Sequence, residues 1–132
     1  MVRKVARMVI FFGVLCALLV TQCGSMFAAK KPVIGLSLSS LFSTAFQALR
    51  DTAVETAKEL GADIIVMSAE NNVDTQYSQI KDLIAKGVDA IICNPADSMA
   101  IVRAVKEANK AGIPFITVDR KAYGGEVAYH IE

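Results

Sequence analysis

A charged pair, Asp119 and Arg120, directly follows the apolar run Ile113–Val118. A carboxylate accepts hydrogen bonds from two neighbouring hydroxyl groups, and a planar guanidinium donates several hydrogen bonds in a fixed fork. Because the chain turns where an apolar strand ends, both side chains can face the same crevice, where together they suit a polyhydroxylated neutral ligand. The alternative is a solvated local ion pair, which is the more common role of an Asp-Arg dipeptide.

Two phenylalanines follow the first apolar run of the chain, Val33–Leu38. Phe42 and Phe46 are four residues apart, a spacing that places two side chains on one face of a helix. Their rings could stack on the apolar face of a sugar ring, although the spacing alone more often indicates that Phe46 belongs to the core. Ser40 and Ser43 are the candidates to cap the helix that begins here.

Signatures of the common enzyme and cofactor sites are absent from the sequence. The segment after the first apolar run is not glycine-rich, and there is no P-loop, nucleophile-elbow serine or His-Glu-x-x-His zinc helix. We interpret Cys93 as a small buried hydrophobe and His130, the only histidine, as a satisfied or solvent-facing strand residue. We therefore expect a binding protein without metal or cofactor rather than an enzyme, with a site of acidic residues as the alternative.

Apolar runs and amphipathic stretches alternate along the chain. The runs predicted as strands are Val33–Leu38, Asp63–Ser68, Val88–Asn94, Ile113–Val118 and Glu126–Ile131. Between them, apolar residues recur every three or four positions, which predicts helices. The helices are expected from Phe42 to Leu60, from Asn72 or Asp74 to Gly87, and from Asp97 or Ser98 to Gly112.

Strands that are apolar on both faces and alternate with helices predict an α/β fold, a doubly wound parallel sheet with helices on both faces. Ligands of such sheets bind beyond the carboxyl ends of the strands. This rule selects four segments of the chain: 39–46, 69–74, 94–98 and 119–125. Within the third segment, Asn94 and Pro95 are interpreted first as turn and cap residues.

The first 29 residues differ from the rest of the chain. They hold 21 apolar residues, three basic residues and no acidic residue. A basic start, an uncharged apolar run of about 13 residues and small residues after it are the pattern of a secretory signal peptide. We expect a signal peptide at 1–29, with cleavage near Ser25 or near Ala28-Ala29. An uncleaved anchor and a lipoprotein modified at Cys23 are the alternatives.

Residues 30–132 have the composition of an ordinary globular domain. They hold 11 basic and 13 acidic residues, and their number is enough for one domain with one core. The slightly acidic balance argues against nucleic-acid binding, which needs a basic face. Their single cysteine forms no intrachain disulfide, so the fold depends on its packed core. Contact with a membrane is expected only through the leader.

Four segments carry a family resemblance: Glu70-Asn71-Asn72, the Asn-Pro-Ala-Asp-Ser run at 94–98, the Gly-Ile-Pro-Phe-Ile-Thr-Val-Asp-Arg run at 112–120, and the Gly-Glu-Val-Ala-Tyr-His-Ile run at 125–131. In their order and spacing they resemble the N-terminal lobe of the ribose/galactose-type periplasmic sugar-binding proteins, which are type I periplasmic binding proteins. Ribose binders are the nearest branch. The resemblance runs from Lys31 to the last residue.

This resemblance implies a fold of two similar α/β lobes, joined by a hinge, that close over one monosaccharide. It also implies an exported, periplasmic solute-binding protein that delivers ribose or a similar sugar to an ABC-type importer. The implied partners are the sugar, the importer's permease and, for some family members, a chemoreceptor.

Site residues follow from the resemblance position by position. Asp119 and Arg120 fall on the pair that binds sugar hydroxyls, and Phe46 falls on one of two adjacent aromatics that pack on the sugar ring. Ser43 falls where ribose binders carry an asparagine, and Ala45 replaces the second aromatic, so the match to a ribose site is incomplete. Phe42, one turn earlier, is the candidate for the missing ring.

The family's second lobe has no counterpart in this sequence. We therefore expect residues 30–132 to be an N-terminal sugar-binding lobe, truncated before the second lobe. Alone it should bind free sugar weakly or not at all, because a half-site does not enclose its ligand. One alternative is a small α/β enzyme or cofactor-binding domain, and another is a lobe that acts only as an interaction module. A sugar-responsive transcription regulator would need a DNA-binding motif where the leader stands.

Overall fold

The computed structural model describes residues 30–132, in which five strands form one parallel sheet. The strands are β1 (Val33–Leu38), β2 (Asp63–Ser68), β3 (Ala90–Cys93), β4 (Phe115–Val118) and β5 (Tyr129–Ile131). Their order across the sheet is β2-β1-β3-β4-β5, and every neighbouring pair is parallel. In the register of the sheet, Leu36 on β1 lies between Val66 on β2 and Ile92 on β3.

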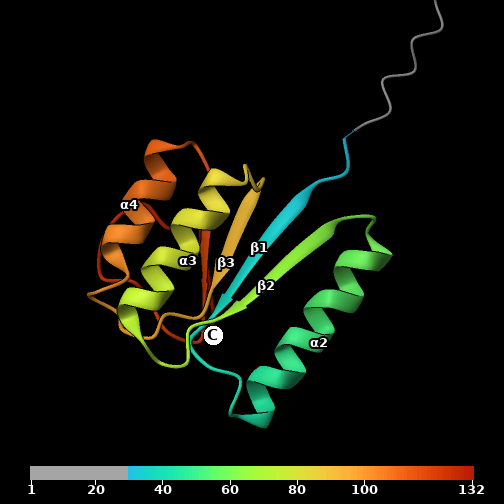
Figure 1. Cartoon of the computed structure of the whole chain (residues 1–132), viewed down its shortest axis with the longest axis horizontal. Helices are drawn as coiled ribbons and strands as arrows, with labels where there is room; N and C mark the ends of the chain where they lie inside the picture. Colours follow the sequence, from blue (N-terminus) through green and yellow to red (C-terminus); the bar gives the residue numbers. More distant parts are fainter. Residues whose placement is uncertain (1–29) are drawn as a thin grey trace, which may run out of the picture. The chain divides into compact units, whose positions relative to one another are not determined.

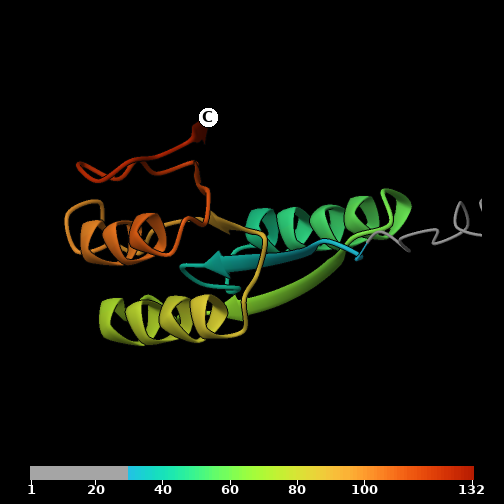
Figure 2. The same cartoon turned by 90° about the horizontal axis from the view of Figure 1, so that it is seen from above.

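Helices of the described part cover both faces of this sheet, which confirms the predicted doubly wound α/β fold. They are α2 (Thr44–Glu59), α3 (Val73–Ala85) and α4 (Val102–Lys110). In Figures 1 and 2, α3 and α4 lie on one side of the sheet and α2 lies on the other. The side chains of β3 alternate accordingly, because Ile91 and Cys93 join the core under α3 and α4 whereas Ile92 lines an apolar groove beside α2.

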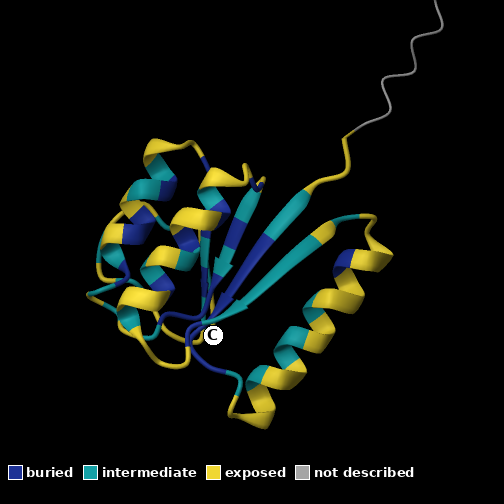
Figure 3. Cartoon of the chain, viewed as in Figure 1, coloured by how far each residue is buried: buried dark blue, intermediate teal, exposed yellow. Residues whose placement is uncertain are grey.

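The two faces are buried to different degrees. Figure 3 shows buried residues along α3 and α4, whereas α2 is mostly exposed. Ile80 and Leu83 of α3 and Val105 of α4 are fully buried together with Phe115 of β4, whereas Ala57 is the one buried residue of α2. Since full burial of a large apolar side chain contributes about 1.5–3 kcal/mol, the face under α3 and α4 supplies most of the packing free energy.

Three of the predicted strands are shorter in the structure, because their first residues are held by helices rather than by the sheet. The amide of Val88 donates to the carbonyl of Leu83 at the end of α3, and that of Ile113 donates to Ala108 at the end of α4. The amide of Glu126 donates to the side chain of Asn109 on α4 at 2.8 Å. The predicted starts of these strands at 88, 113 and 126 are therefore wrong, whereas Val33–Leu38 and Asp63–Ser68 are confirmed.

The first helix begins later than predicted, so Phe42 is not part of it. The hydroxyl of Ser40 accepts a hydrogen bond from the amide of Phe42 at 3.0 Å, which turns the chain before the helix. Ser43 then caps α2 through a hydrogen bond from the amide of Ala45 at 3.2 Å, and this predicted cap is confirmed. Phe42 is 80% exposed and Leu60, beyond the other end of α2, is 77% exposed, so the prediction that both lie on the buried stripe is wrong.

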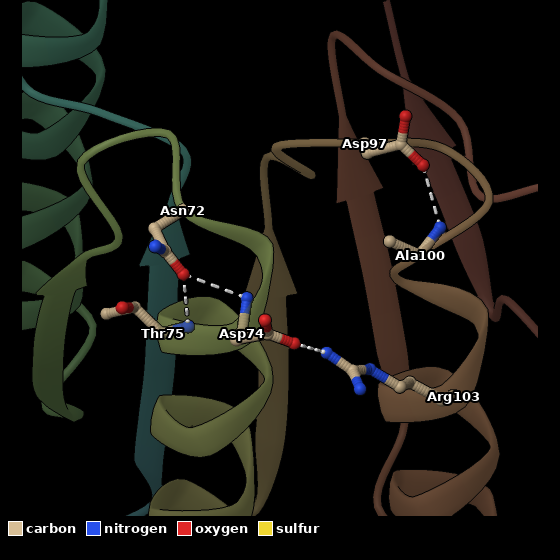
Figure 4. Close-up of polar contacts among 6 residues, drawn as sticks. All are labelled: Asn72, Asp74, Thr75, Asp97, Ala100 and Arg103. Carbon is tan, nitrogen blue, oxygen red and sulfur yellow. Dashed lines mark hydrogen bonds and ion pairs between the residues drawn. The ribbon is translucent and has the colours of Figure 1, made fainter.

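The starts of α3 and α4 differ in how they are capped (Figure 4). Asn72 is the N-cap of α3 and accepts two backbone hydrogen bonds, at 3.0 and 2.8 Å, as predicted. The carboxylate of Asp97 accepts two backbone hydrogen bonds in a turn, but α4 begins only at Val102, so neither Asp97 nor Ser98 caps the helix directly.

No helix within residues 30–132 has both the length and the apolar character needed to cross a bilayer. The predicted signal peptide at 1–29 lies outside the residues that the structure describes. The leader and its cleavage position therefore stay predictions.

Candidate functional site

The carboxyl ends of β1, β3 and β4 meet at one edge of the sheet, where the arrowheads converge in Figure 1. A polar residue follows each strand directly: Ser39 after β1, Asn94 after β3 and Asp119 after β4. The side chains of these three residues form a continuous series of hydrogen bonds. The hydroxyl of Ser39 donates to Oδ1 of Asn94, and Nδ2 of Asn94 donates to Oδ2 of Asp119 at 3.1 Å.

The side-chain amide of Asn94 is 1% exposed, and its partners determine its orientation. Its Nδ2 also donates to the carbonyl oxygen of Val118 at 3.2 Å. A carbonyl oxygen and an ionised carboxylate only accept hydrogen bonds, so the atom that faces Val118 and Asp119 must be the nitrogen. Asn94 therefore joins β1 to β4 through its side chain, beyond the turn role predicted from the sequence.

Asp119 itself has an unusual backbone conformation, with φ at 64°. This left-handed region costs an L-residue about 1–2 kcal/mol, and Asp and Asn are the residues other than glycine that visit it most readily. The amide of Asp119 donates to the carbonyl of Ile131 on β5 at 2.8 Å, which fixes the turn to the neighbouring strand. The residue is exposed, so its carboxylate is accessible to a ligand.

The guanidinium of Arg120 is held by the loop between β3 and α4. Its Nη1 donates to the carbonyl oxygen of Pro95 at 3.1 Å and also to that of Ala96. Within residues 30–132, the hydrogen bonds of this guanidinium involve Nη1 alone. Since a guanidinium carries five N–H donors, the other donors are available to a ligand.

Gln76 on α3 in turn holds this loop. It is 1% exposed, and its Nε2 donates to the carbonyl of Asn94 at 2.9 Å while its Oε1 accepts from the amide of Ala96 at 2.8 Å. The same nitrogen lies 3.3 Å from the hydroxyl of Ser37 on β1. One buried side chain thus fixes the segment 94–96, which contacts both members of the charged pair.

The remaining predicted site residues, Phe42, Ser43 and Phe46, lie at the start of α2, beyond the end of β1. Phe46 is partly buried, and Phe42 and Ser43 are exposed. Among residues 30–132, hydrogen bonds join Asp119 to Asn94 and Arg120 to the 95–96 carbonyls, and none joins either of them to Ser43. The structure therefore joins the charged pair to the β3–α4 loop, whereas the α2 group follows β1 without a hydrogen bond to that pair among the described residues.

An open, polar cavity of about 390 Å³ lies beside the charged pair. Its lining comprises Ser98, Asp119, Arg120, Lys121, Tyr123, His130 and Glu132. Lys121 and Glu132 form an ion pair across 2.8 Å, which lowers the pKa of the Glu132 carboxyl. Nδ1 of His130 lies 2.9 Å from Oγ1 of Thr117, whereas its buried Nε2 has no hydrogen-bond partner in the described part of the chain.

Within residues 30–132, no three His, Cys, Asp or Glu side chains lie close enough together to hold a metal ion. Cys93 is fully buried, which confirms that prediction, and its burial raises the pKa of the thiol. After β4, Asp119 offers an exposed carboxylate and Arg120 an exposed guanidinium, and both residues line the same polar cavity. This arrangement can bind a neutral ligand that carries several hydroxyl groups.

Most of the chain matches one protein family. Residues 34–132 match the family described as "Periplasmic binding protein domain". The chain belongs to this family. The resemblance inferred from the four sequence segments is thereby confirmed for the periplasmic binding protein domain.

Known relatives of this periplasmic binding protein domain include ribose-binding proteins. The ribose import binding protein RbsB of Bacillus subtilis is 43% identical over 98 residues, which are 74% of this chain and 32% of the relative. RbsB of Escherichia coli is 40% identical over 104 residues, which are 79% of this chain and 35% of the relative. The chain spans about a third of the length of these curated relatives.

Solved structures show the same fold. A periplasmic solute-binding protein of an ABC transporter from Actinobacillus succinogenes, crystallised with bound D-allose, superposes with a TM-score of 0.69 and 39% identity. The match covers 75% of this chain and 38% of that protein. The described residues therefore have the architecture of part of a sugar-binding periplasmic protein.

The sequence predicted Ser39 only as the first residue of the strand-end segment 39–46 and gave Asn94 only a turn role, and Gln76 was not selected. One signal for Gln76 was present in the sequence. Gln76 lies four residues before Ile80 and seven before Leu83, so it occupies the inward-facing stripe of α3. A polar residue in such a stripe needs a buried partner, but the sequence does not say which one.

Proposed function

We propose that this chain is the N-terminal lobe of an exported solute-binding protein, which binds ribose or a similar monosaccharide for delivery to an ABC-type importer. The observation that carries the proposal is the pair Asp119 and Arg120, exposed beyond β4 with both side chains held by one loop. A carboxylate and a guanidinium that line one cavity match the donors and acceptors of a sugar. The relatives named for ribose import and the neighbour with bound D-allose support the choice of ligand.

In this proposal the start of α2 contacts the sugar ring. Phe46, partly buried in the first turn of α2, packs on the apolar face of the ring. The oxygen of Ser43 accepts the capping hydrogen bond from the amide of Ala45, which leaves its O–H free to donate to a sugar hydroxyl. Phe42 is 80% exposed just before this cap and supplies a second ring.

The proposed location is the periplasm, reached through the leader at 1–29. The proposed partners are the sugar, the permease of the importer and a chemoreceptor. Mass spectrometry of the chain after expression in a Gram-negative bacterium tests the export step. We expect a mature N-terminus near Ser25 or Ala28-Ala29, whereas an intact leader or a lipid on Cys23 would contradict a cleaved, soluble periplasmic form.

Ligand-observed NMR tests the sugar site directly. Saturation transferred from the protein to D-ribose or D-allose should be detectable with the wild-type chain and lost in Asp119→Asn. The matched control is Asp51→Asn, which removes an exposed carboxylate paired with Arg50 on α2. Equal saturation transfer in wild type and both variants, or none to any sugar with the folded wild type, would overturn the proposal.

A further inference from the structure

Asn94 makes more hydrogen bonds than a turn residue needs. Its side chain is hydrogen-bonded to the hydroxyl of Ser39 after β1, to the carbonyl oxygen of Val118 at the end of β4 and to the carboxylate of Asp119. Its backbone carbonyl accepts a hydrogen bond from Gln76. These partners leave the amide a single orientation, with its nitrogen toward Asp119. The amide is fully buried, whereas the carboxylate that it contacts is exposed.

We propose that Asn94 is a positioning residue, which holds the carboxylate of Asp119 in the orientation that binds sugar hydroxyls. The inference rests on the proposed function, since Asp119 is a sugar ligand only in that proposal. In this inference Asn94 acts through Asp119.

The physical reason is preorganisation. An exposed aspartate is free to change its side-chain rotamer, and fixing one rotamer on binding weakens the affinity for a ligand. A hydrogen bond from a buried amide selects the rotamer in advance, so the sugar meets a carboxylate that is already placed. The bond is made to Oδ2 of Asp119, so Oδ1 is the oxygen that we expect to accept from the sugar.

The same segment positions the second member of the pair. Arg120 is fixed by the carbonyls of Pro95 and Ala96, which directly follow Asn94 in the chain. Gln76 holds this segment from below through Asn94 and Ala96. The loop 94–96 is therefore a platform for both charged side chains, and Asn94 is the part of it that contacts Asp119.

Two NMR readouts on the 132-residue chain test this inference. The first is the set of three-bond couplings that report the χ1 rotamer of Asp119, measured without sugar. The second is the apparent affinity for D-ribose. We expect one dominant rotamer in wild type, averaged couplings in Asn94→Ala, and an affinity lower by about tenfold, as for loss of a hydrogen bond to a charged group.

The matched control is Asn109→Ala. Asn109 also makes two side-chain hydrogen bonds, both at 2.8 Å, but to the backbone of Glu126 rather than to the charged pair. This variant should leave the Asp119 rotamer and the ribose affinity unchanged, whatever it costs in stability. An equal loss of affinity in both variants would assign Asn94 a general structural role and overturn the inference.

The two proposals fail in different ways. Rotamer averaging at Asp119 in the wild-type chain overturns the positioning role without any variant, so the test does not depend on Asn94→Ala folding. Asn94→Ser, which is smaller than asparagine but keeps a polar group, serves if the alanine variant unfolds. A different outcome is that Asp119 has one rotamer that depends on Asn94 but the folded wild-type chain does not bind ribose. That outcome contradicts the sugar site, and with it the proposal that the fixed carboxylate binds sugar hydroxyls.

Discussion

The side-chain nitrogen of Gln76 donates to the backbone carbonyl of Asn94 across 2.9 Å, and this bond links α3 to the loop beneath the charged pair. Gln76 also accepts from the amide of Ala96, so it satisfies both a donor and an acceptor of the loop. All of these groups are buried or partly buried. The geometry of the site therefore depends on a helix residue remote from it in sequence.

Replacing Gln76 with leucine should destabilise the chain strongly. The change keeps a similar volume but leaves the carbonyl of Asn94 and the amide of Ala96 without their partner, and each buried unsatisfied group costs about 1–3 kcal/mol. We expect a loss of about 2–4 kcal/mol in the free energy of unfolding, measured by urea denaturation. The control Gln79→Leu removes one hydrogen bond, to the carbonyl of Ser68, and should cost less. Equal costs would contradict this assignment.

The choice of substitution at Asp119 matters because of its left-handed backbone. Alanine at φ 64° should be less stable than asparagine by about 1 kcal/mol, since asparagine tolerates this region and alanine does not. Both variants remove the negative charge. Alanine also removes the acceptor of the hydrogen bond from Asn94, which the side-chain oxygen of asparagine can keep, so both effects should lower the thermal unfolding midpoint of the alanine variant. Identical midpoints for the two variants would contradict both the left-handed backbone and this hydrogen bond.

Cys93 predicts how stability depends on alkaline pH. Burial raises the pKa of its thiol in the folded chain, so the unfolded chain loses this proton first as the pH rises. The contribution of the protonated thiol to the free energy of unfolding is fully present below the ordinary thiol pKa of about 8.5. Above that pH the free energy of unfolding should fall by about 1.4 kcal/mol per pH unit. The slope between pH 8 and pH 10 should be reduced in Cys93→Ala. An unchanged slope in that variant would contradict the buried, protonated thiol.

Gly35 predicts a steric conflict between β1 and α3. A Cβ atom at this position would lie 2.8 Å from Cδ1 of Leu83, which is fully buried and has little room to move. Gly35→Ala should therefore cost about 1–3 kcal/mol, as overpacked cores do. The double variant Gly35→Ala/Leu83→Val should lose less than the sum of the two single variants, because the shorter side chain relieves the contact. Strict additivity would argue against this packing.

Much of the fold follows from local patterns in the sequence. Runs such as Ile64-Ile65-Val66, apolar on both faces, have few stable environments other than a buried parallel strand, and Asn72 marks the start of a helix through its own chemistry. Phe42 was misplaced because its spacing fits a helix. The turn that excludes it depends on a single hydrogen bond to Ser40, and periodicity does not reveal such a bond.

The site is only partly visible in the sequence. Asp119 and Arg120 are adjacent and follow a predicted strand, so their common location is a local property of the chain. Asn94 lies 25 positions before Asp119, and their contact exists only because β3 and β4 are neighbours in the sheet. Pairings of this kind depend on strand order, which residue patterns do not determine. The support of the site by Ser39, Gln76 and Asn94 therefore required the structure.

The most direct test of the central claim is to map where a sugar binds. In a titration of the ¹⁵N-labelled chain with D-ribose, the amides of Asn94, Ala96, Asp119 and Arg120 should shift together with those at the start of α2. The site is open on one side, so we expect a Kd of about 1 mM or weaker. Ribose-dependent shifts elsewhere, for example beside α4 at Asn109 and Gly112, or no shifts at saturating ribose, would contradict a sugar site at these strand ends.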